Sequence, residues 1–128
     1  MFDKSYTTYM TYTTHHTTHI LDAAGQTPGR LASRIAVLLI GKGKRTYAPN
    51  IDAGDLVVVK NVQALRTTGR KLEQKEYRHF SGYPGGLKRV KWGTLLERNP
   101  KKLLRLAVAR MLPKNKLRTP RINRLKFD

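Results

Sequence analysis

The segment from Tyr77 to Lys91 concentrates the residue types that suit contact with a nucleic acid. Its sequence, YRHFSGYPGGLKRVK, holds three aromatic rings, a histidine, three glycines and four cations. Glycines let a backbone approach a phosphate closely, Lys and Arg neutralise its charge, and aromatic rings stack on unpaired bases. A glycine-rich hairpin whose rings fill the core would have the same composition. We expect both, with some rings buried and the cations pointing outward. The candidate contacts here are Arg78, His79, Ser81, Tyr83, Gly85, Gly86, Lys88 and Lys91.

The rest of the chain is also strongly basic. It has 26 Lys and Arg against 8 acids, a net charge of +18, which makes nucleic acid the first partner class and an anionic membrane surface the second. Residues 1–64 carry seven cations against four acids (+3), and residues 65–128 carry nineteen against four (+15). The second half is therefore predicted to be the main contact surface. Further candidate contacts are Arg30, Arg34, Lys42, Lys44, Arg45, Lys71, Lys114, Lys116, Arg118, Arg121, Arg124 and Lys126.

Motifs for enzymatic chemistry are weak. The spacing Gly25-x-x-x-Gly29 follows a predicted strand, but it lacks the GxGxxG pattern and the Gly-Lys-Ser/Thr ending of nucleotide loops. The segment 41–44 (GKGK) follows a predicted helix, whereas a phosphate loop precedes one. Asp22 ends a predicted strand, where an α/β enzyme would place a catalytic carboxylate, but without an evident partner base it is expected to cap a turn. We predict no catalytic residue, no cofactor and no small-molecule substrate.

Metal and membrane sites are not expected either. His15, His16 and His19 could hold a metal, but we expect a bland tail there, and the absence of cysteine excludes disulfides and Cys-ligated zinc. The longest apolar run is Ile35–Ile40, far shorter than the roughly 20 residues of a membrane span. The N-terminus lacks the apolar segment of a secretory signal. These features predict an intracellular protein without a membrane partner.

Two strands and a helix between them are predicted ahead of the Tyr77–Lys91 segment. A strand at Ile20–Ala23 precedes Thr27 and Pro28, a cap and a first helical residue. The apolar residues that follow recur on one helical face, which Gly41 ends. They are Leu31, Ile35, Leu38 and Leu39. The unbroken apolar run Leu56–Val59 predicts a strand covered on both faces, as in a parallel sheet. The order is that of a right-handed βαβ unit.

Further elements are predicted on either side of the basic segment. Ala64–Thr67 is a possible short strand, and Thr94-x-x-Glu97 is a capping box for a one-turn helix. Asn99 and Pro100 begin a longer helix that Pro113 ends. Its predicted buried face is formed by Leu104, Ala107, Val108 and Met111.

The chain is expected to divide into three parts. Residues 1–19, rich in Thr, Tyr and His, are an extended N-terminal arm; residues 20–113 are an α/β RNA-binding domain; residues 114–128 are a basic C-terminal arm. We expect the C-terminal arm to become ordered on RNA, so that the core closes without it. The alternative is that its interleaved apolar residues pack on the core. These residues are Leu117, Ile122, Leu125 and Phe127.

The motifs taken together resemble a known family, the bacterial-type large-subunit ribosomal protein L-thirteen family. The resemblance covers about residues 20–126. The matching residues before the basic segment are Asp22–Ala23, Gly25, Gly29–Ala32, Gly41–Lys42, Tyr47, Pro49, Gly54–Asp55 and Thr68–Lys71. Those within and after it are His79, Ser81–Lys88, Asn99–Pro100, Ala107–Val108 and Met111–Lys114. The chain departs from the family at both ends, in its Thr/Tyr/His lead-in and in stopping after Phe127–Asp128.

The resemblance implies a three-layer α/β/α domain around a four-stranded, mainly parallel sheet. It also implies a structural constituent of the large ribosomal subunit that binds and organises its ribosomal RNA early in assembly. The partners would be this RNA and neighbouring large-subunit proteins. The location would be the cytoplasm, in a bacterial ribosome, with an organellar ribosome as the alternative. Two other classes of protein are alternatives. One is a DNA-compacting protein, which the charge alone allows. The other is an RNA-modifying enzyme, which is disfavoured because the sequence lacks a cofactor motif and a paired acid and base.

Overall fold

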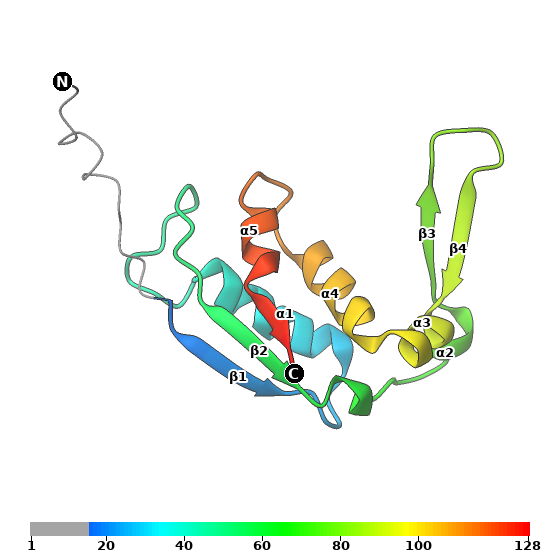
Figure 1. The fold of residues 1–128 in the computed structure, drawn as a ribbon, viewed down its shortest axis with the longest axis horizontal. Coiled ribbons are helices and arrows are strands. Elements are labelled where there is room, and N and C mark those ends of the chain that lie inside the picture. The colour runs from blue at the N-terminus through cyan, green and yellow to red at the C-terminus, as the bar shows by residue number, and fades with distance from the viewer. Residues whose placement is uncertain (1–15) are drawn as a thin grey trace, which may run out of the picture.

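The computed structural model describes residues 16–128, which form a mixed α/β domain with a projecting hairpin (Figure 1). The first elements are strand β1 (Thr18–Asp22), helix α1 (Pro28–Ile40), strand β2 (Leu56–Lys60) and a short 3-10 helix, η2 (Val62–Ala64). Helix α2 (Lys71–Gln74), the hairpin strands β3 (Glu76–Phe80) and β4 (Leu87–Lys91), and helix α3 (Trp92–Arg98) follow. The chain ends with α4 (Pro100–Met111), α5 (Arg118–Asn123) and β5 (Leu125–Phe127).

The main sheet has three parallel strands in the order β1-β2-β5. Val57 and Val59 of β2 are fully buried against the helices, whereas the other face of the sheet exposes Ile20 of β1. The sheet therefore has helices α1 and α4 on one face, which makes two layers (Figure 1). The prediction of a four-stranded, three-layer arrangement is wrong for the described residues, because Ala64–Thr67 adds no strand and β3 pairs only with β4. The predicted βαβ unit with parallel strands is confirmed.

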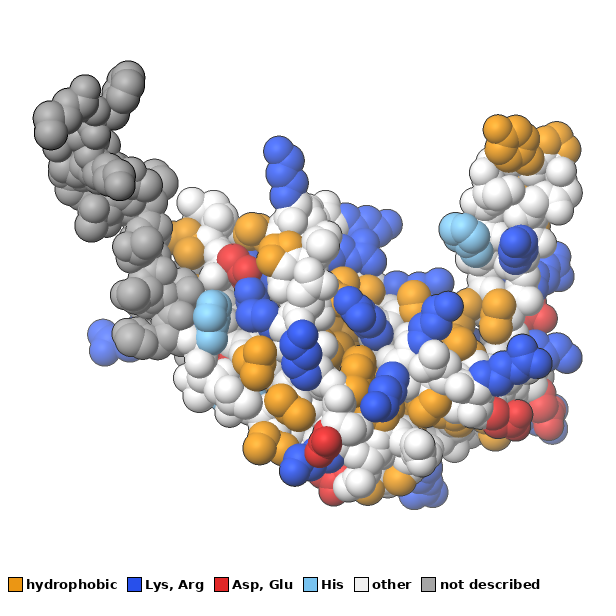
Figure 2. Space-filling model, viewed as in Figure 1, with side chains coloured by type: hydrophobic (Ala, Val, Ile, Leu, Met, Phe, Trp, Pro, Cys, Tyr) orange, Lys and Arg blue, Asp and Glu red, His pale blue; other side chains and the backbone are white. Residues whose placement is uncertain are grey.

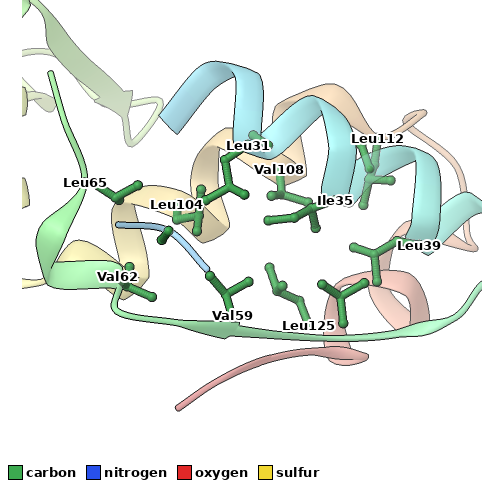
Figure 3. Packing of buried hydrophobic residues seen from close by; sticks show 14 of the residues in the cluster. Leu31, Ile35, Leu39, Val59, Val62, Leu65, Leu104, Val108, Leu112 and Leu125 are labelled. Atoms are coloured by element: carbon green, nitrogen blue, oxygen red, sulfur yellow. The ribbon is translucent and has the colours of Figure 1, made fainter. Parts of the chain in front are cut away.

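The core forms where α1 and α4 meet the inner face of the sheet (Figure 3). The predicted apolar face of α1 is confirmed, with Leu31, Ile35 and Leu39 fully buried. The predicted start of α4 is also confirmed, since the side chain of Asn99 accepts a hydrogen bond from the Lys102 amide at 3.2 Å. Met111 was expected in the core but is exposed at the end of α4.

Two glycines allow the segment after α1 to pass close to the helix. Gly41 ends α1 with a φ of 81°, and a Cβ there would lie 2.8 Å from the carbonyl oxygen of Ala53. At Gly54 a Cβ would lie 1.7 Å from the carbonyl oxygen of Leu39. The loop 41–55 is therefore held against the C-terminal end of α1, where only glycine fits.

The C-terminal residues are not an extended arm. After a turn they form α5 and then β5, which pairs in parallel with β2 through Val57↔Leu125 and Val59↔Phe127. Leu125 is buried, so the core includes residues that were expected to order only on RNA. The alternative prediction, in which the interleaved apolar side chains pack on the domain, is the correct one. The physical reason is the open edge of β2, which supplies hydrogen bonds and an apolar neighbour for a very short strand.

Helix α3 and the N-terminal residues also differ from their predictions. Helix α3 begins at Trp92 with Lys91 at its cap position, so Thr94 lies inside the helix and the predicted capping box is wrong. Residues 1–15 of the expected N-terminal arm lie outside the described residues. The remainder of that range is not an arm, because Thr18 and His19 already pair with β2.

Candidate nucleic-acid interface

The predicted contact segment forms an antiparallel hairpin that stands away from the domain (Figure 1). Its register pairs Arg78 with Arg89, and His79 with Lys88. Every residue of β4 is exposed, and so are the last three residues of β3. The prediction of a glycine-rich hairpin with outward cations is confirmed.

The base of the hairpin is anchored by two buried aromatic rings. Tyr77 and Trp92 pack with their centroids 5.8 Å apart, and Leu103 of α4 completes the cluster. The Arg110 guanidinium lies 4.5 Å from the Tyr77 ring centroid, and Lys75 Nζ lies 4.0 Å from that of Trp92. Burial raises the pKa of Tyr77, although the charge of Arg110 opposes this effect. The cluster gives a long exposed hairpin a rigid attachment to the helices.

The tip of the hairpin presents the other two rings to solvent. Phe80 is 61% exposed and Tyr83 is 76% exposed, values that are unusual for large apolar side chains without a partner. Gly85 has a φ of 73°, and Gly86 packs inside the turn, where a Cβ would lie 2.0 Å from Ser81 Oγ. The glycines thus shape a tight tip that holds both rings outward. Such rings can stack on unpaired bases.

The hairpin also carries unbalanced positive charge. Arg78 and Arg89 are directly opposite each other, and like charges in this position destabilise a strand pair. Lys88 and Lys91 lie on the same exposed strand. A polyanion bound along the strands would remove this repulsion.

A second basic surface lies between the hairpin and α5. Figure 2 shows Lys and Arg side chains spread over α4 and α5, along the hollow edge between the hairpin and the opposite end of the domain. The exposed cations of α4 and of the turn that follows it are Lys101, Lys102, Arg105, Arg110, Lys114 and Lys116. The hairpin and this surface together form one concave basic face.

The predicted contact residues differ in their exposure. Those that are exposed are Arg30, Arg34, Lys42, Arg45, Lys71, Arg78, His79, Ser81, Tyr83, Gly85, Lys88, Lys91, Lys114, Lys116 and Lys126. Those that are partly buried are Lys44, Gly86, Arg118 and Arg124. Arg121 is buried. The structure brings the hairpin residues together, whereas Arg30 and Lys71 lie with Arg66 around a separate cleft.

Arg121 and Arg124 are structural, which corrects their prediction as RNA contacts. Arg121 is 1% exposed, and its Nε lies 3.4 Å from Asp52 Oδ1. Arg124 donates to both carboxylate oxygens of Asp52, at 2.5 and 2.7 Å, and to the Leu39 carbonyl at 3.0 Å. Burial works to raise the pKa of Asp52, but the hydrogen bonds and charges of Arg124 and Arg121 outweigh it, so the pKa is lowered. This pair of guanidiniums ties the C-terminal elements to the loop 41–55.

Asp55 makes a similar bridge on the other side of that loop. It accepts hydrogen bonds from the Thr17 amide at 3.1 Å and His19 Nε2 at 2.9 Å, and Lys44 Nζ lies 2.5 Å from its carboxylate. Burial again opposes these partners, and the net effect lowers the pKa of Asp55. Lys44 therefore has a structural partner within the domain.

Asp22 caps a turn, as predicted. Its Oδ1 accepts hydrogen bonds from the Ala24 amide and from Asn61 Nδ2, both at 3.0 Å. These two bonds lower the pKa of Asp22, the amide having the larger effect. The carboxylate thus fixes the loops after β1 and β2, and its contacts are those of a turn.

The described range, residues 16–128, lacks two other features. That range contains no cluster of three His, Cys, Asp or Glu side chains with the geometry to hold a metal ion. It also contains no helix with the length and apolar character needed to cross a membrane.

Several basic and aromatic residues of the exposed faces were not among the predicted contacts. Phe80 and Arg89 belong to the hairpin, Lys101, Lys102 and Arg105 to α4, and Arg66 and Lys75 to the cleft near the start of α1. The alternation of side chains along a strand could have signalled Arg89. The cleft residues had no such signal, because they come from segments that only the fold brings together.

Comparison with known proteins decides between the classes that this geometry allows. Residues 16–127 match the family model described as ribosomal protein L13. The chain belongs to this family. The matched residues include both the hairpin and the C-terminal strand.

Relatives named "Large ribosomal subunit protein uL13" support the same assignment. The protein of Aquifex aeolicus is 52% identical over 109 residues, which are 84% of this chain and 74% of the relative. That of Chloroflexus aggregans is 48% identical over 109 residues, covering 85% and 76%. L13 proteins are ribosomal structural proteins, so the chain is not an enzyme, as the sequence predicted.

Proposed function

We propose that this L13 protein is a structural constituent of the large ribosomal subunit, where it binds and organises the ribosomal RNA early in assembly. The main support for RNA binding is the hairpin, which presents Phe80 and Tyr83 at its tip and opposed cations along its strands. Family membership supports the ribosomal part. The site of action is a bacterial ribosome in the cytoplasm, because the curated relatives are bacterial.

The proposed contact has two physical components. Cations along β3 and β4 neutralise phosphates and release counterions, which gives affinity that falls with salt by a log–log slope of roughly −0.7 to −0.9 per phosphate. The tip rings stack on unpaired bases, each worth about 1–3 kcal/mol. RNA offers such bases in loops and bulges, whereas a DNA duplex keeps its bases stacked. The exposed rings therefore favour RNA over a DNA-compacting role.

The partners follow from the same surfaces. Large-subunit ribosomal RNA occupies the concave basic face, and neighbouring large-subunit proteins meet the parts that the RNA leaves free. The function requires no cofactor and no small-molecule substrate. An early assembly role is consistent with a protein whose contact surfaces are preformed, since binding then costs little ordering.

The tip rings provide the direct test. In the double variant Phe80→Ala/Tyr83→Ala, affinity for deproteinised large-subunit ribosomal RNA should fall by about tenfold or more, because two stacking contacts are lost. The matched control is Leu87→Ala/Val90→Ala, which removes two exposed apolar side chains from the same hairpin. It should change the affinity by about twofold or less. Equal effects of the two double variants would contradict the stacking role.

Incorporation is the second measurement. The tagged wild-type chain, expressed in a bacterium, should stay with large subunits after a high-salt wash, and the tip variant should be depleted from them. The affinity of the wild type for an RNA is compared with its affinity for a DNA duplex of the same length as that RNA. Equal affinity for DNA and RNA, with loss of the chain from washed subunits, would favour the DNA-compacting class.

A further inference from the structure

A cleft of about 830 Å³ lies at the start of α1, on a part of the domain distinct from the hairpin tip. Its walls come from the turn before α1 and the first turns of α1, from the segment that precedes α2, and from residues at α2, α3 and the end of α4. Four cations line it: Arg30, Arg66, Lys71 and Lys75. Among the described residues of its walls, none is acidic. The cleft therefore concentrates positive charge without an internal counter-charge.

The rim of the cleft is held in place by the backbone. The Gly25 amide donates to the Ala64 carbonyl at 2.9 Å, and the Arg66 amide donates to the Gln26 carbonyl at 3.0 Å. Gly25 has a φ of 68°, a conformation that glycine adopts without strain. These bonds join the turn before α1 to the segment that carries Arg66, so the two sides of the cleft are preorganised.

The start of α1 offers backbone donors to this cleft. The amides of Gly29 and Arg30 have no partner within the helix, because first-turn N–H groups point beyond its end. Thr27 occupies the cap position, but its side chain makes no cap hydrogen bond to the described helix. A Cβ at Gly29 would meet nothing within 4 Å, so the backbone there is open to an approaching group. The dipole of a 13-residue helix favours an anion at this position.

Two buried polar atoms, on residues that line the cleft, also have no hydrogen-bond partner among residues 16–128. Trp92 is 3% exposed, and its Nε1 has no hydrogen-bond partner among residues 16–128. The buried Oγ1 of Thr67 is unpartnered in the same described range. Both are donors, and an oxygen-rich ligand is the kind of group that satisfies donors. This is an observation independent of the helix end, and it points to the same kind of ligand.

The cations around the cleft are close enough for their like charges to repel one another. Burial lowers the pKa of Lys75, and the positive charges of Lys71 and Arg110 lower it further. Lys75 also lies over the Trp92 ring, which covers the aromatic residue of the cleft. A bound anion would relieve the repulsion, whereas an adenine or guanine base would find the ring already occupied.

We propose that this cleft binds a phosphate of an RNA backbone, as a second RNA contact that acts together with the hairpin. The non-bridging phosphate oxygens accept hydrogen bonds from the Gly29 and Arg30 amides, and Arg30, Arg66 and Lys71 neutralise the charge. The Gly25-x-x-x-Gly29 turn thereby serves phosphate binding without a nucleotide motif. The inference rests on the proposed function, because it takes RNA as the source of the phosphate.

A pair of substitutions at the cap position isolates the charge of the cleft. Both Thr27→Asp and Thr27→Asn supply a good cap, so both variants should fold with a melting temperature equal to that of the wild type or higher. Only Thr27→Asp places a negative charge where the phosphate would sit. Its affinity for deproteinised large-subunit ribosomal RNA should fall by about tenfold, while Thr27→Asn stays within about twofold of the wild type.

The source of the phosphate is tested on the wild-type protein by NMR. A short single-stranded RNA should shift the Gly29 and Arg30 amide signals at lower concentration than inorganic phosphate or ADP. Shifts with inorganic phosphate or ADP but not with RNA would overturn the inference in favour of a free phosphate compound. Equal RNA affinities of Thr27→Asp and Thr27→Asn would overturn it as well, and would leave the hairpin function intact. If the wild type itself fails to bind ribosomal RNA, the proposed function fails and the inference falls with it.

Discussion

Two pairs of arginines in this protein have opposite surroundings although they look alike in the sequence. Arg78 and Arg89 face each other across an exposed hairpin and have no acid opposite them in the strand register. Arg121 and Arg124 lie inside the domain and share the carboxylate of Asp52. An exposed, unbalanced cation costs the free protein stability and is available to a polyanion. A buried, paired cation stabilises the fold and is unavailable.

The comparison separates the effects of charge removal on stability and on RNA affinity. Neutralising the hairpin pair should leave the fold intact and weaken RNA binding. Disrupting the buried group should destabilise the domain and leave the RNA affinity of folded molecules unchanged. Each of the following changes tests one side of this contrast.

Truncation after Pro113 is expected to have the largest effect. It removes α5 and β5, uncovers the hydrogen-bonding edge of β2 and leaves Asp52 without its two partners. We expect the shortened chain to lack a cooperative unfolding transition, because it loses a buried core residue, a strand of the sheet and a buried ion-pair group, and a typical domain is stable by only about 5–15 kcal/mol. Circular dichroism during heating checks this. A melting temperature near that of the full chain would show that the C-terminal strand is dispensable and would restore the extended-arm prediction.

Asp52→Asn is expected to have the next largest effect. It leaves Arg121 buried without a counter-charge, and breaking a buried pair by removing one partner costs about 3–5 kcal/mol. Asp52 is partly exposed, so we expect the lower end of this range in urea unfolding. The control is Asp128→Asn, which removes a surface partner 3.8 Å from Lys60 and should cost under about 0.5 kcal/mol. Similar small losses in both variants would mean that the buried group does not stabilise the fold.

Arg78→Gln/Arg89→Gln should have the opposite pattern. Stability should stay constant or rise by a few tenths of a kcal/mol, because a like-charge pair is removed. The slope of log affinity for ribosomal RNA against log salt should become shallower by roughly 1.5, the value for two lost phosphate contacts. For the wild type we expect a slope steeper than about −5. An unchanged slope in the variant would exclude these arginines from the RNA contact.

Acid should lower the stability that the Asp52–Arg121–Arg124 group provides, and this is the smallest of the expected effects. The pKa of Asp52 is lower in the folded protein than in the unfolded chain. The ionised carboxylate therefore stabilises the fold fully above the unfolded pKa of about 3.9, and this stabilisation is lost as the pH falls through the folded pKa. The melting temperature of the wild type should therefore fall below about pH 4 more steeply than that of Asp52→Asn. Parallel pH profiles of the two proteins would show that Asp52 contributes nothing to acid sensitivity.

Local signals in the sequence were sufficient for the elements that depend on neighbouring residues. The cap and proline at Thr27–Pro28, the apolar spacing of α1 and the glycine at position 41 predicted that helix to its last residue. The basic, glycine-rich segment predicted the hairpin and its outward cations. Turn chemistry and helical periodicity act over a few residues, and the family resemblance rested on such motifs.

The tertiary structure alone decided which cations are exposed and how the C-terminal residues join the fold. Arg121 meets a carboxylate 69 residues away, so its burial depends on the packing of α5 against the loop 41–55. A three-residue strand such as β5 has too few residues for a periodic signal, and it exists because β2 offers a free edge. The cleft at the start of α1 combines cations from separate segments for the same reason. Composition indicated a polyanion as the partner class, and long-range packing determined which of the cations remain exposed on the folded domain.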